Sequence, residues 1–396
     1  MTTSVPFGSL LSKIIDNRGK TCPTSEAGIP LIATNCIKNE HLYPVYEKVR
    51  YVSQEVYDSW FRGHPEPGDL IFVLKGTPGR VNWVNNPVDF CIAQDMVALR
   101  VDENKVYPKY LFAVLRSSQI QQEIEGLHVG SLIPHFKKSD FDDLQIPLVE
   151  EKLQKYIGDV YFNLSLKIDL LHRQNKTLEA MAETLLIQHV LPREDEQNDG
   201  LYLLGDYLET ISVTHKFPNP QVVFLNTSDI YKGKVLTHEL SEVKGLPGQA
   251  KKSIKKGDIL FSEIRPANGR YALIDFDADN YVVSTKLMVL RAKQPNLIGL
   301  LYFYLTNKQV TDWLQVLAES RSGTFPQITF DQVADLELRL PQGSDLDNLI
   351  GLLDDILLKQ SANNKQIQTL ENLRDTLLPK LMSGEVRVQY QTEEVA

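Results

Sequence analysis

The chain carries the same sequence pattern twice, and this duplication constrains its fold more than any other feature. Blocks between residues 7 and 186 recur in the same order between residues 204 and 378, at offsets of 189 to 197 residues. GDLIF at 68–72 returns as GDILF at 257–261, and Leu178-Glu179 returns as Leu370-Glu371. Solenoid repeats are roughly 20 to 50 residues long, much shorter than this unit. The pattern therefore predicts two similar domains in one chain, and a binding partner that also has two parts.

Composition narrows the class of protein. With 396 residues, of which 42% are hydrophobic and 23% charged, the chain suits a globular protein of two or more domains. Cys22, Cys36 and Cys91 are odd in number and lack CxxC spacing, which favours neither a disulfide framework nor a zinc site. The N-terminus lacks the pattern of a signal peptide and no apolar run is long enough for a membrane span. We expect a cytoplasmic protein.

Each half of the duplication predicts a mixed α+β domain with a curved sheet. Short apolar runs of strand character lie at 30–32, 70–74, 96–101 and 144–147, and again at 222–225, 259–261, 287–290 and 336–340. One helical pattern follows late in each half, at 110–124 and at 297–317.

Two stretches, 148–192 and 342–383, have apolar residues spaced in threes and fours, as in long amphipathic helices. We expect the two helices to pair with each other and to act as a spacer, although long helices can also cap a large core. Polar residues within the stripe, such as Asn363, would weaken the pairing but fix its register. The predicted pairing residues are Ile157, Val160, Leu164, Leu171, Leu178, Met181, Leu185, Leu349, Leu352, Ile356, Asn363, Leu370, Leu373 and Leu377.

Charge does not exclude a nucleic-acid partner. The formal net charge of −9 opposes phosphate binding, but basic residues gather locally, as in the lysines between 251 and 256. The loops at 75–80 and 265–270 combine glycine with basic side chains, which suits close approach to a phosphate or a guanine edge. A single lysine run is equally well explained as a solvated face.

The sequence has no catalytic signature. It lacks a P-loop, HExxH, GxSxG and the adenine-methylation tetrapeptide with two adjacent prolines, and its eight histidines form no metal-binding spacing. A duplicated chain without chemistry is typical of a recognition subunit or a scaffold rather than an enzyme.

The chain resembles the specificity (S) subunit of Type I restriction-modification systems over essentially its whole length. The resemblance rests on the duplication, on PGDLIFVLKG at 67–76 and KGDILFSEIR at 256–265, and on QTLENLRDTLLPKLMSGEV at 368–386. It implies two target-recognition domains separated by two long helices that pair as an antiparallel coiled coil with a pseudo-twofold internal repeat. Each domain would read one half of a bipartite, asymmetric DNA site, and the helices would set the spacer.

The resemblance also implies a division of the chain and a set of partners. The expected parts are target-recognition domains at 1–147 and 197–341, spacer helices at 148–192 and 342–383, and a C-terminal tail at 384–396. The partners would be double-stranded DNA, two modification (methyltransferase) subunits and restriction (endonuclease and translocase) subunits. S-adenosylmethionine, ATP and Mg²⁺ would be used by those subunits, and this chain would bind no cofactor.

DNA-contacting residues cannot be transferred by motif, so candidates come from loop chemistry alone. They are Lys75, Thr77, Arg80, Ser131, His135, Lys137, Lys138, Lys251, Lys252, Lys255, Arg265, Arg270, Arg321 and Ser322. Two alternatives stay open: the recognition subunit of a Type IIB system, and a protein scaffold that does not touch DNA.

Overall fold

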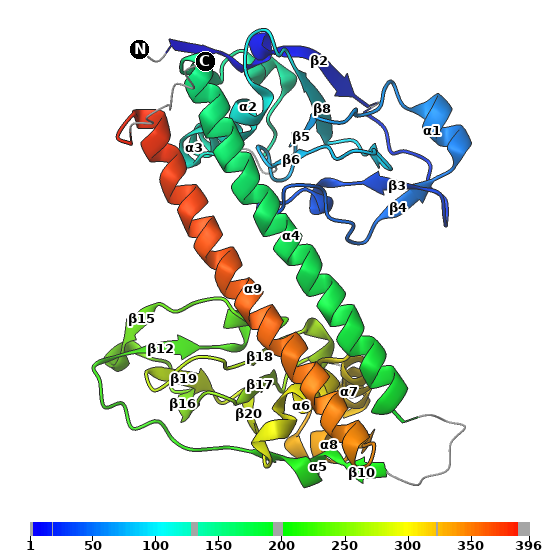
Figure 1. Cartoon of the computed structure of the whole chain (residues 1–396), viewed down its shortest axis with the longest axis vertical. Coiled ribbons are helices and arrows are strands. Elements are labelled where there is room, and N and C mark those ends of the chain that lie inside the picture. Colours follow the sequence, from blue (N-terminus) through cyan, green and yellow to red (C-terminus); the bar gives the residue numbers. More distant parts are fainter. Residues whose placement is uncertain (1–2, 18, 128–133, 193–200, 322–323, 387–396) are drawn as a thin grey trace, which may run out of the picture. The chain divides into compact units, whose positions relative to one another are not determined.

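The computed structural model describes residues 3–17, 19–127, 134–192, 201–321 and 324–386 (Figure 1). The chain folds as two units, the first comprising Met1–Arg173 with Asn364–Ala396 and the second Gln174–Asn363. The division falls in the middle of both long helices, so each unit contains half of each. Among the described residues, no helix combines the length and the apolar character that a membrane span requires.

The described residues of the first unit form three sheets. Their strands have the order β2-β8-β5-β6, β4-β3-β7 and β1-β9, and β3 pairs with β7 in parallel. The elements are β1 (Thr3–Pro6), η1 (Phe7–Leu10), β2 (Leu11–Asp16), β3 (Ile29–Ile32), η2 (Thr34–Cys36), β4 (Arg50–Val52), α1 (Gln54–Trp60), β5 (Leu70–Val73), β6 (Val81–Trp83), β7 (Cys91–Ile92), β8 (Met96–Val101), α2 (Pro108–Leu115), α3 (Ser118–Gly126), η3 (Lys138–Phe141), β9 (Gln145–Leu148) and α4 (Glu151–His189).

Among the described residues, the second unit repeats the four-stranded antiparallel sheet and the sheet that joins its first and last strands, but its mixed sheet has four strands instead of three and it has one further two-stranded sheet. Its sheets have the order β11-β20-β17-β18, β15-β12-β19-β16, β10-β21 and β13-β14, and β12 pairs with β19 in parallel. The elements are β10 (Leu201–Leu203), α5 (Leu204–Tyr207), β11 (Leu208–Thr210), β12 (Gln221–Leu225), η4 (Thr227–Asp229), β13 (Ile230–Tyr231), β14 (Lys234–Val235), β15 (Leu240–Glu242), η5 (Val243–Gly245), β16 (Ala250–Ser253), β17 (Ile259–Ser262), η6 (Pro266–Asn268), β18 (Tyr271–Leu273), β19 (Tyr281–Ser284), β20 (Leu287–Ala292), η7 (Pro295–Leu297), α6 (Ile298–Thr306), α7 (Lys308–Arg321), α8 (Phe330–Ala334), β21 (Glu337–Arg339) and α9 (Ser344–Ser383).

The predicted fold class is confirmed. The eight strands expected from the sequence correspond to β3, β5, β8, β9, β12, β17, β20 and β21. In each unit the four-stranded antiparallel sheet packs against a short helix, α2 or α6, whose residues are buried over most of its length. A helix that is apolar all round is one enclosed by the core.

Each helical pattern near the end of a half is two helices rather than one. The first pattern divides at Ser117, whose Oγ accepts a hydrogen bond from Ile120 N at 3.4 Å. The second divides at Asn307, whose Oδ1 accepts from Gln309 N at 2.8 Å. Ser and Asn side chains satisfy the free N–H groups at a helix start, so the chain can turn there and begin a new helix.

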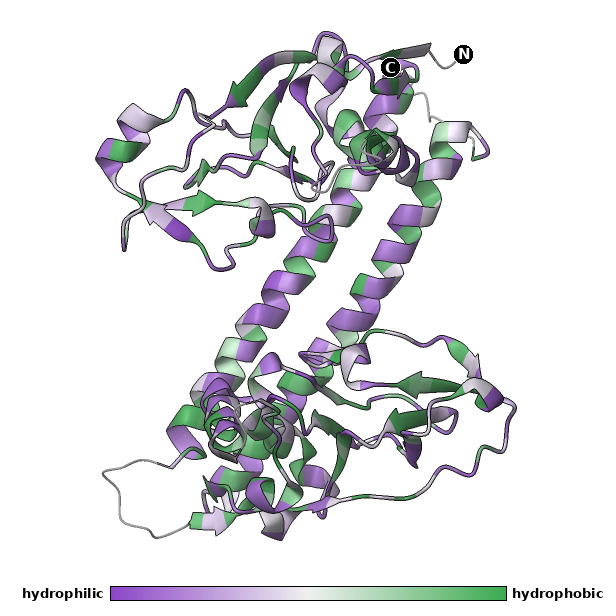
Figure 2. Ribbon diagram, turned by 180° about the vertical axis from the view of Figure 1, so that it is seen from behind, coloured by the Kyte–Doolittle hydropathy of each residue, from purple (hydrophilic) through white to green (hydrophobic). Residues whose placement is uncertain are grey.

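The long helices α4 and α9 pair antiparallel within each unit, and green and purple residues alternate along both in Figure 2. In the first unit Ile168 and Leu171 of α4 pack against Ile367 of α9. In the second unit Asn363 Nδ2 donates to Gln174 Oε1 at 2.9 Å and to Asn175 Oδ1 at 2.7 Å. Asn363 is buried, so this predicted polar position lies in the pairing seam.

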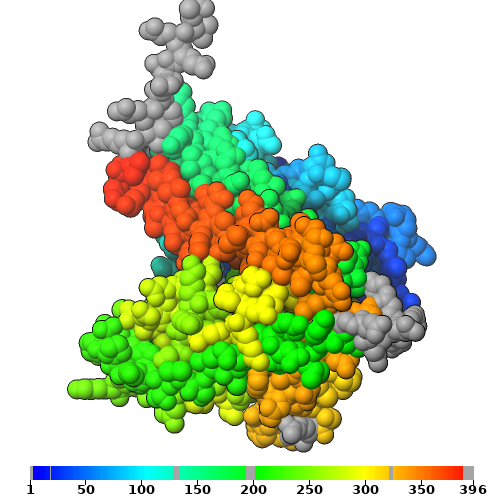
Figure 3. Space-filling view, turned by 60° about the horizontal axis from the view of Figure 1, so that its bottom comes forward, coloured from blue at the N-terminus to red at the C-terminus, as the bar shows by residue number. Residues whose placement is uncertain are grey.

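Three predicted pairing positions are wrong. Met181, Leu352 and Leu373 are 50%, 52% and 47% exposed. The residue that follows each of them in the sequence is buried instead: Ala182, Leu353 and Arg374. Figure 3 shows the outer surface of α9, coloured orange to red, uncovered on the face drawn. Each helix half also packs on the core of its own unit, so the buried stripe turns away from the one that spacing alone predicts.

The other predicted pairing positions are at least partly buried. Ile157, Leu171, Leu349 and Ile356 are buried. The partly buried positions are Val160, Leu164, Leu178, Leu185, Leu370 and Leu377.

Candidate nucleic-acid interface

In the first unit the loop that follows β5 is held against the segment that precedes η3. Gly76 N donates to Pro134 O at 3.0 Å and Phe136 N donates to Leu74 O at 2.7 Å. Between these two bonds Lys75 forms a β-bridge with His135. Because Phe136 is fully buried, it anchors the segment in the core while Lys75 and His135 remain exposed.

We call these backbone contacts between the loop after β5 and the segment before η3 the ladder. The second unit builds the same ladder from different residues. Arg265 N donates to Pro326 O at 3.2 Å, and Ile328 N donates to Glu263 O at 2.9 Å. Ile264 and Gln327 form the bridge between them. The hydrogen bonds therefore pair the two units position by position: Lys75 corresponds to Ile264, Gly76 to Arg265, and His135 to Gln327.

A third segment completes each ladder. In the first unit Leu74 N donates to Asp95 O at 2.8 Å, and in the second Glu263 N donates to Lys286 O at 3.1 Å. An acidic residue in one unit thus corresponds to a basic residue in the other. The backbone framework is common to both units, whereas the side chains at its edge differ in charge and size.

Charged groups meet around Lys286 in the second unit. Lys286 Nζ donates to Gln327 Oε1 at 3.2 Å and lies 3.8 Å from a carboxylate oxygen of Glu263. Lys252 Nζ, half-buried, donates to Thr285 O at 3.1 Å and to Leu287 O at 2.8 Å. Burial lowers the pKa of Lys252, Glu263 opposes this shift and the charge of Lys286 adds to it. Lys252 therefore stabilises the segment that presents Lys286.

The Arg270 side chain is also held by contacts within the second unit. Its Nη1 donates to Ser228 O at 3.0 Å and to Ile230 O at 3.1 Å, and its guanidinium lies 5.3 Å from the ring centroid of Tyr231. These contacts hold the β13–β14 hairpin. A role in folding accounts for Arg270 without a ligand.

The remaining candidates fall into three groups. Near the first ladder, Thr77 and Arg80 are partly exposed, Lys137 is exposed and Lys138 forms an ion pair with Asp16. Exposed Lys255 precedes β17 and Arg265 follows it, so the structure places them at opposite ends of that strand; Lys251, also exposed, lies on β16. Ser131 and Ser322 lie outside the described residues, and Arg321 ends α7.

Sequence reasoning missed Lys286. It lies in the turn between β19 and β20, far along the chain from the loops that it joins, and no glycine or basic run marks it. The pairing of β17 with β20 and of β5 with β8 makes Lys286 equivalent to Asp95. An alignment of the two repeats over these strands could have identified the position. Within the part of the chain that the structure describes, no three His, Cys, Asp or Glu side chains gather as metal ligands.

The sequence model of the family described as "Type I restriction modification DNA specificity domain" matches residues 16–180 and 211–372, well over half of the chain. The two matched stretches each cover one copy of the ladder.

Two curated relatives are similar in sequence. Over 181 residues the chain is 48% identical to the Type I restriction enzyme HindI specificity subunit of Haemophilus influenzae, a match that covers 44% of this chain and only 39% of that relative. Over 389 residues it is 22% identical to the Type I restriction enzyme MjaIX specificity subunit of Methanocaldococcus jannaschii, covering 91% and 87% of the two chains.

A solved structure is similar in fold. The crystal structure of the Type I restriction-modification system S subunit from M. genitalium aligns over 96% of each chain with a TM-score of 0.53 and 16% identity.

Proposed function

The chain belongs to the Type I restriction modification DNA specificity family, and from this we propose that it is the non-catalytic DNA-recognition subunit of a restriction-modification complex. Each unit reads one half of a bipartite, asymmetric site. The methyltransferase subunits, with S-adenosylmethionine, and the endonuclease subunits, with ATP and Mg²⁺, perform the chemistry. The complex acts in the cytoplasm.

The observation that carries the proposal is the repeated ladder with unlike side chains. A common backbone framework lets both units approach duplex DNA in the same way, since hydrogen bonds to phosphates position a protein without reading sequence. Lys75, His135 and Asp95 edge one ladder, whereas Arg265, Gln327 and Lys286 edge the other. Different donors and acceptors select different bases, so two unlike half-sites follow.

DNA binding is tested with the chain assembled with its methyltransferase subunits. We expect retardation of a duplex that contains the site, with an association constant that falls steeply as salt rises, by roughly 0.9 logarithmic units per phosphate contact for each decade of salt. A complex that assembles but shows no salt-dependent retardation is a protein scaffold and contradicts the proposal.

The site itself comes from mapping methylated adenines in the host genome with this gene intact and deleted. We expect one methylated motif with two half-sites and a fixed gap to vanish on deletion. A motif without a gap, or methylation that persists, contradicts reading by two units.

We further propose that α4 and α9 set the gap between half-sites. Both helices continue through the point where the chain divides into units. Inserting roughly seven residues, one heptad, after Arg173 and again after Asn363 preserves the pairing register and adds about 10 Å to each helix. We expect the accepted gap to change, by about 3 base pairs, while the half-sites stay the same. An unchanged gap refutes this role.

A further inference from the structure

Arg265 holds a backbone conformation that favours glycine. Its φ is 46° and its ψ is 73°, in the left-handed region. The corresponding residue of the first unit is Gly76, whose φ is 87°. Both donate the matching hydrogen bond of the ladder, to Pro326 O and to Pro134 O respectively. The ladder therefore requires positive φ at this position, and glycine meets that requirement without a Cβ penalty.

Folding gives no reason for an arginine at this position. Pro266 follows it, and proline further restricts the residue that precedes it. The Arg265 side chain is exposed, and across the ranges that the structure describes its guanidinium makes no hydrogen bond or ion pair. Arg270, five positions on, donates to two backbone carbonyls. Non-glycine residues in strained conformations are found at functional sites, where the side chain is needed.

The loop that carries Arg265 is fixed on both sides. Asn268 N donates to Arg265 O at 2.9 Å, and Gly269 N donates to Pro266 O at 3.1 Å. Ala267 N donates to Gln315 Oε1 of α7 at 3.3 Å, and Pro266 is buried. The guanidinium therefore projects from a backbone that is already ordered, which lowers the entropy lost when it binds.

We infer that Arg265 is a specificity-determining residue that donates two hydrogen bonds to O6 and N7 of a guanine in the half-site read by the second unit. The inference rests on the proposed function and deepens it. An arginine fork matches a guanine edge in the major groove. A phosphate clamp would serve both units alike, yet the first unit has Gly76 at this position. The Arg265 side chain therefore serves only the half-site that the second unit reads.

The test uses the complex with its methyltransferase subunits and the variant Arg265→Gly, binding a library of duplexes in which each base pair of the site is varied. Glycine suits the left-handed φ, so we expect the thermal unfolding midpoint to be no lower than that of the wild type. We expect discrimination at one guanine of one half-site to fall roughly 5- to 150-fold, with the other half-site read as before.

Arg265→Lys separates a base contact from a phosphate contact. Lysine retains the charge but lacks the planar fork, so base reading predicts relaxed discrimination at the same guanine in this variant too. Lys256→Ala, which removes an exposed cation at the opposite end of β17, is the matched control and should leave discrimination unchanged.

Three results overturn the inference: uniform loss of affinity for all sequences in Arg265→Gly, unchanged discrimination, or a lower unfolding midpoint. If the wild-type complex itself shows no sequence preference, the proposed function fails as well. If the wild type discriminates and Arg265→Gly does so equally, only the role of Arg265 fails.

Discussion

Asp258 and Arg291 join β17 and β20, the central strands of the antiparallel sheet of the second unit, through a two-point ion pair. Arg291 Nε donates to Oδ1 at 2.7 Å and Nη2 donates to Oδ2 at 2.9 Å. Oδ2 also accepts from Lys255 N at 2.9 Å, which closes the turn before β17. The carboxylate is fully buried and satisfied on both oxygens, so this one side chain fixes the turn, the strand start and the strand pair.

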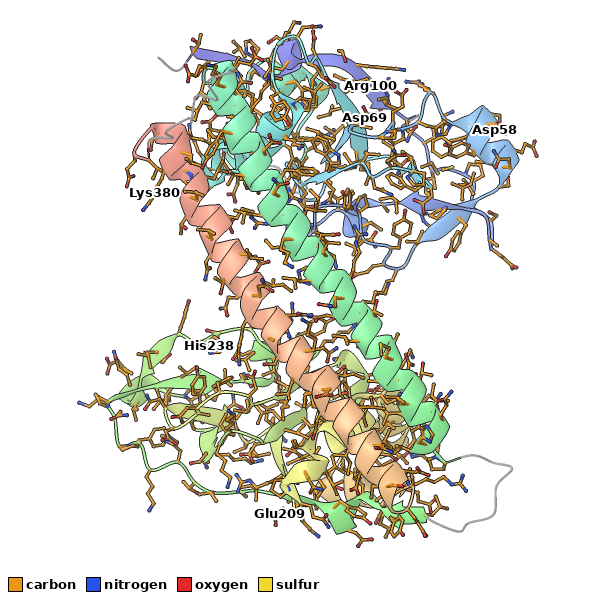
Figure 4. The ribbon with its side chains drawn as sticks, viewed as in Figure 1. Asp58, Asp69, Arg100, Glu209, His238 and Lys380 are labelled. Atoms are coloured by element: carbon orange, nitrogen blue, oxygen red, sulfur yellow. The ribbon has the colours of Figure 1, made fainter. Side chains whose placement is uncertain are left out.

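Asp69 and Arg100 form the same arrangement in the first unit (Figure 4). Arg100 Nε donates to Oδ1 at 3.0 Å and Nη2 to Oδ2 at 3.1 Å, while Glu66 N donates to Oδ2 at 2.8 Å. The Gly-Asp pair of each repeat is thus explained by folding. The ion pair lies at the opposite end of the central strand from the ladder and leaves the ladder free to vary.

Replacing Asp258 with alanine should destabilise the chain by on the order of 3 kcal/mol, because Arg291 loses its partner and the turn loses its acceptor. Urea unfolding measures the change. Glu239→Ala, at an exposed residue of the same unit, should change the free energy of unfolding by less than about 0.5 kcal/mol. Equal effects of the two substitutions would show that the ion pair has no structural role.

Asn363→Ala should destabilise the chain by about 1–2 kcal/mol. The variant loses hydrogen bonds to Gln174 and Asn175, each worth about 1 kcal/mol, and the helix propensity of alanine offsets part of that loss. Gln366→Ala removes an amide from an exposed position of α9 and should be neutral or slightly stabilising. Urea unfolding again provides the comparison, and a neutral Asn363→Ala contradicts a polar contact in the seam.

Local pattern predicted most of the fold because the duplication repeats it. The strands β5 and β17 are fully buried runs after a Gly-Asp turn, apolar except for Ser262, and the long helices have apolar residues spaced in threes and fours over most of their length. The seam position of Leu352 was wrong because two stripes of α9 fit the spacing, and the packing of α9 on its own unit selects between them. The breaks at Ser117 and Asn307 each depend on the side chain of a single residue, which caps the next helix, and the apolar spacing continues across both positions.

The candidate site was less accessible to sequence reasoning. Arg265 and Arg270 look alike in a basic loop, yet one projects from a strained backbone and the other holds a hairpin. The pairing register of β20 with β17 is what brings Lys286 to the site. Contacts between distant segments decide these roles, and the residue types in one loop do not encode them.

Gly158→Ala in α4 should destabilise the chain even though alanine is the better helix former by about 1 kcal/mol. A Cβ at Gly158 would lie 2.6 Å from Tyr110 N, so α2 would have to move. We expect a net loss of up to about 2 kcal/mol, since overpacking a core costs about 1–3 kcal/mol and the gain in helix propensity offsets about 1 kcal/mol of that cost. Gly351→Ala in α9 is the control: a Cβ there meets nothing within 4 Å among the residues that the structure describes, and we expect a gain of about 1 kcal/mol. Stabilisation by both substitutions would contradict close packing of α4 on α2.

His64 should make the first unit less stable as the pH falls through about 6.5. Its ring stacks on Tyr57 with 3.8 Å between centroids, Nε2 lies 3.0 Å from Tyr57 O, and Nδ1 is buried with no partner among the described residues. Burial lowers the pKa of His64, and the Tyr57 carbonyl and Asp58 oppose only part of that shift. Between the lowered folded pKa and the ordinary unfolded one, the unfolded chain binds more protons, so the free energy of unfolding falls with decreasing pH and levels off below the folded pKa. His64→Phe keeps a stacked ring, so the free energy of unfolding, measured with urea between pH 5 and about 7.5, should lose this part of its decrease. His189→Gln, at the exposed end of α4, is the control and should retain the decrease. A decrease of the same size in His64→Phe would assign it to other groups.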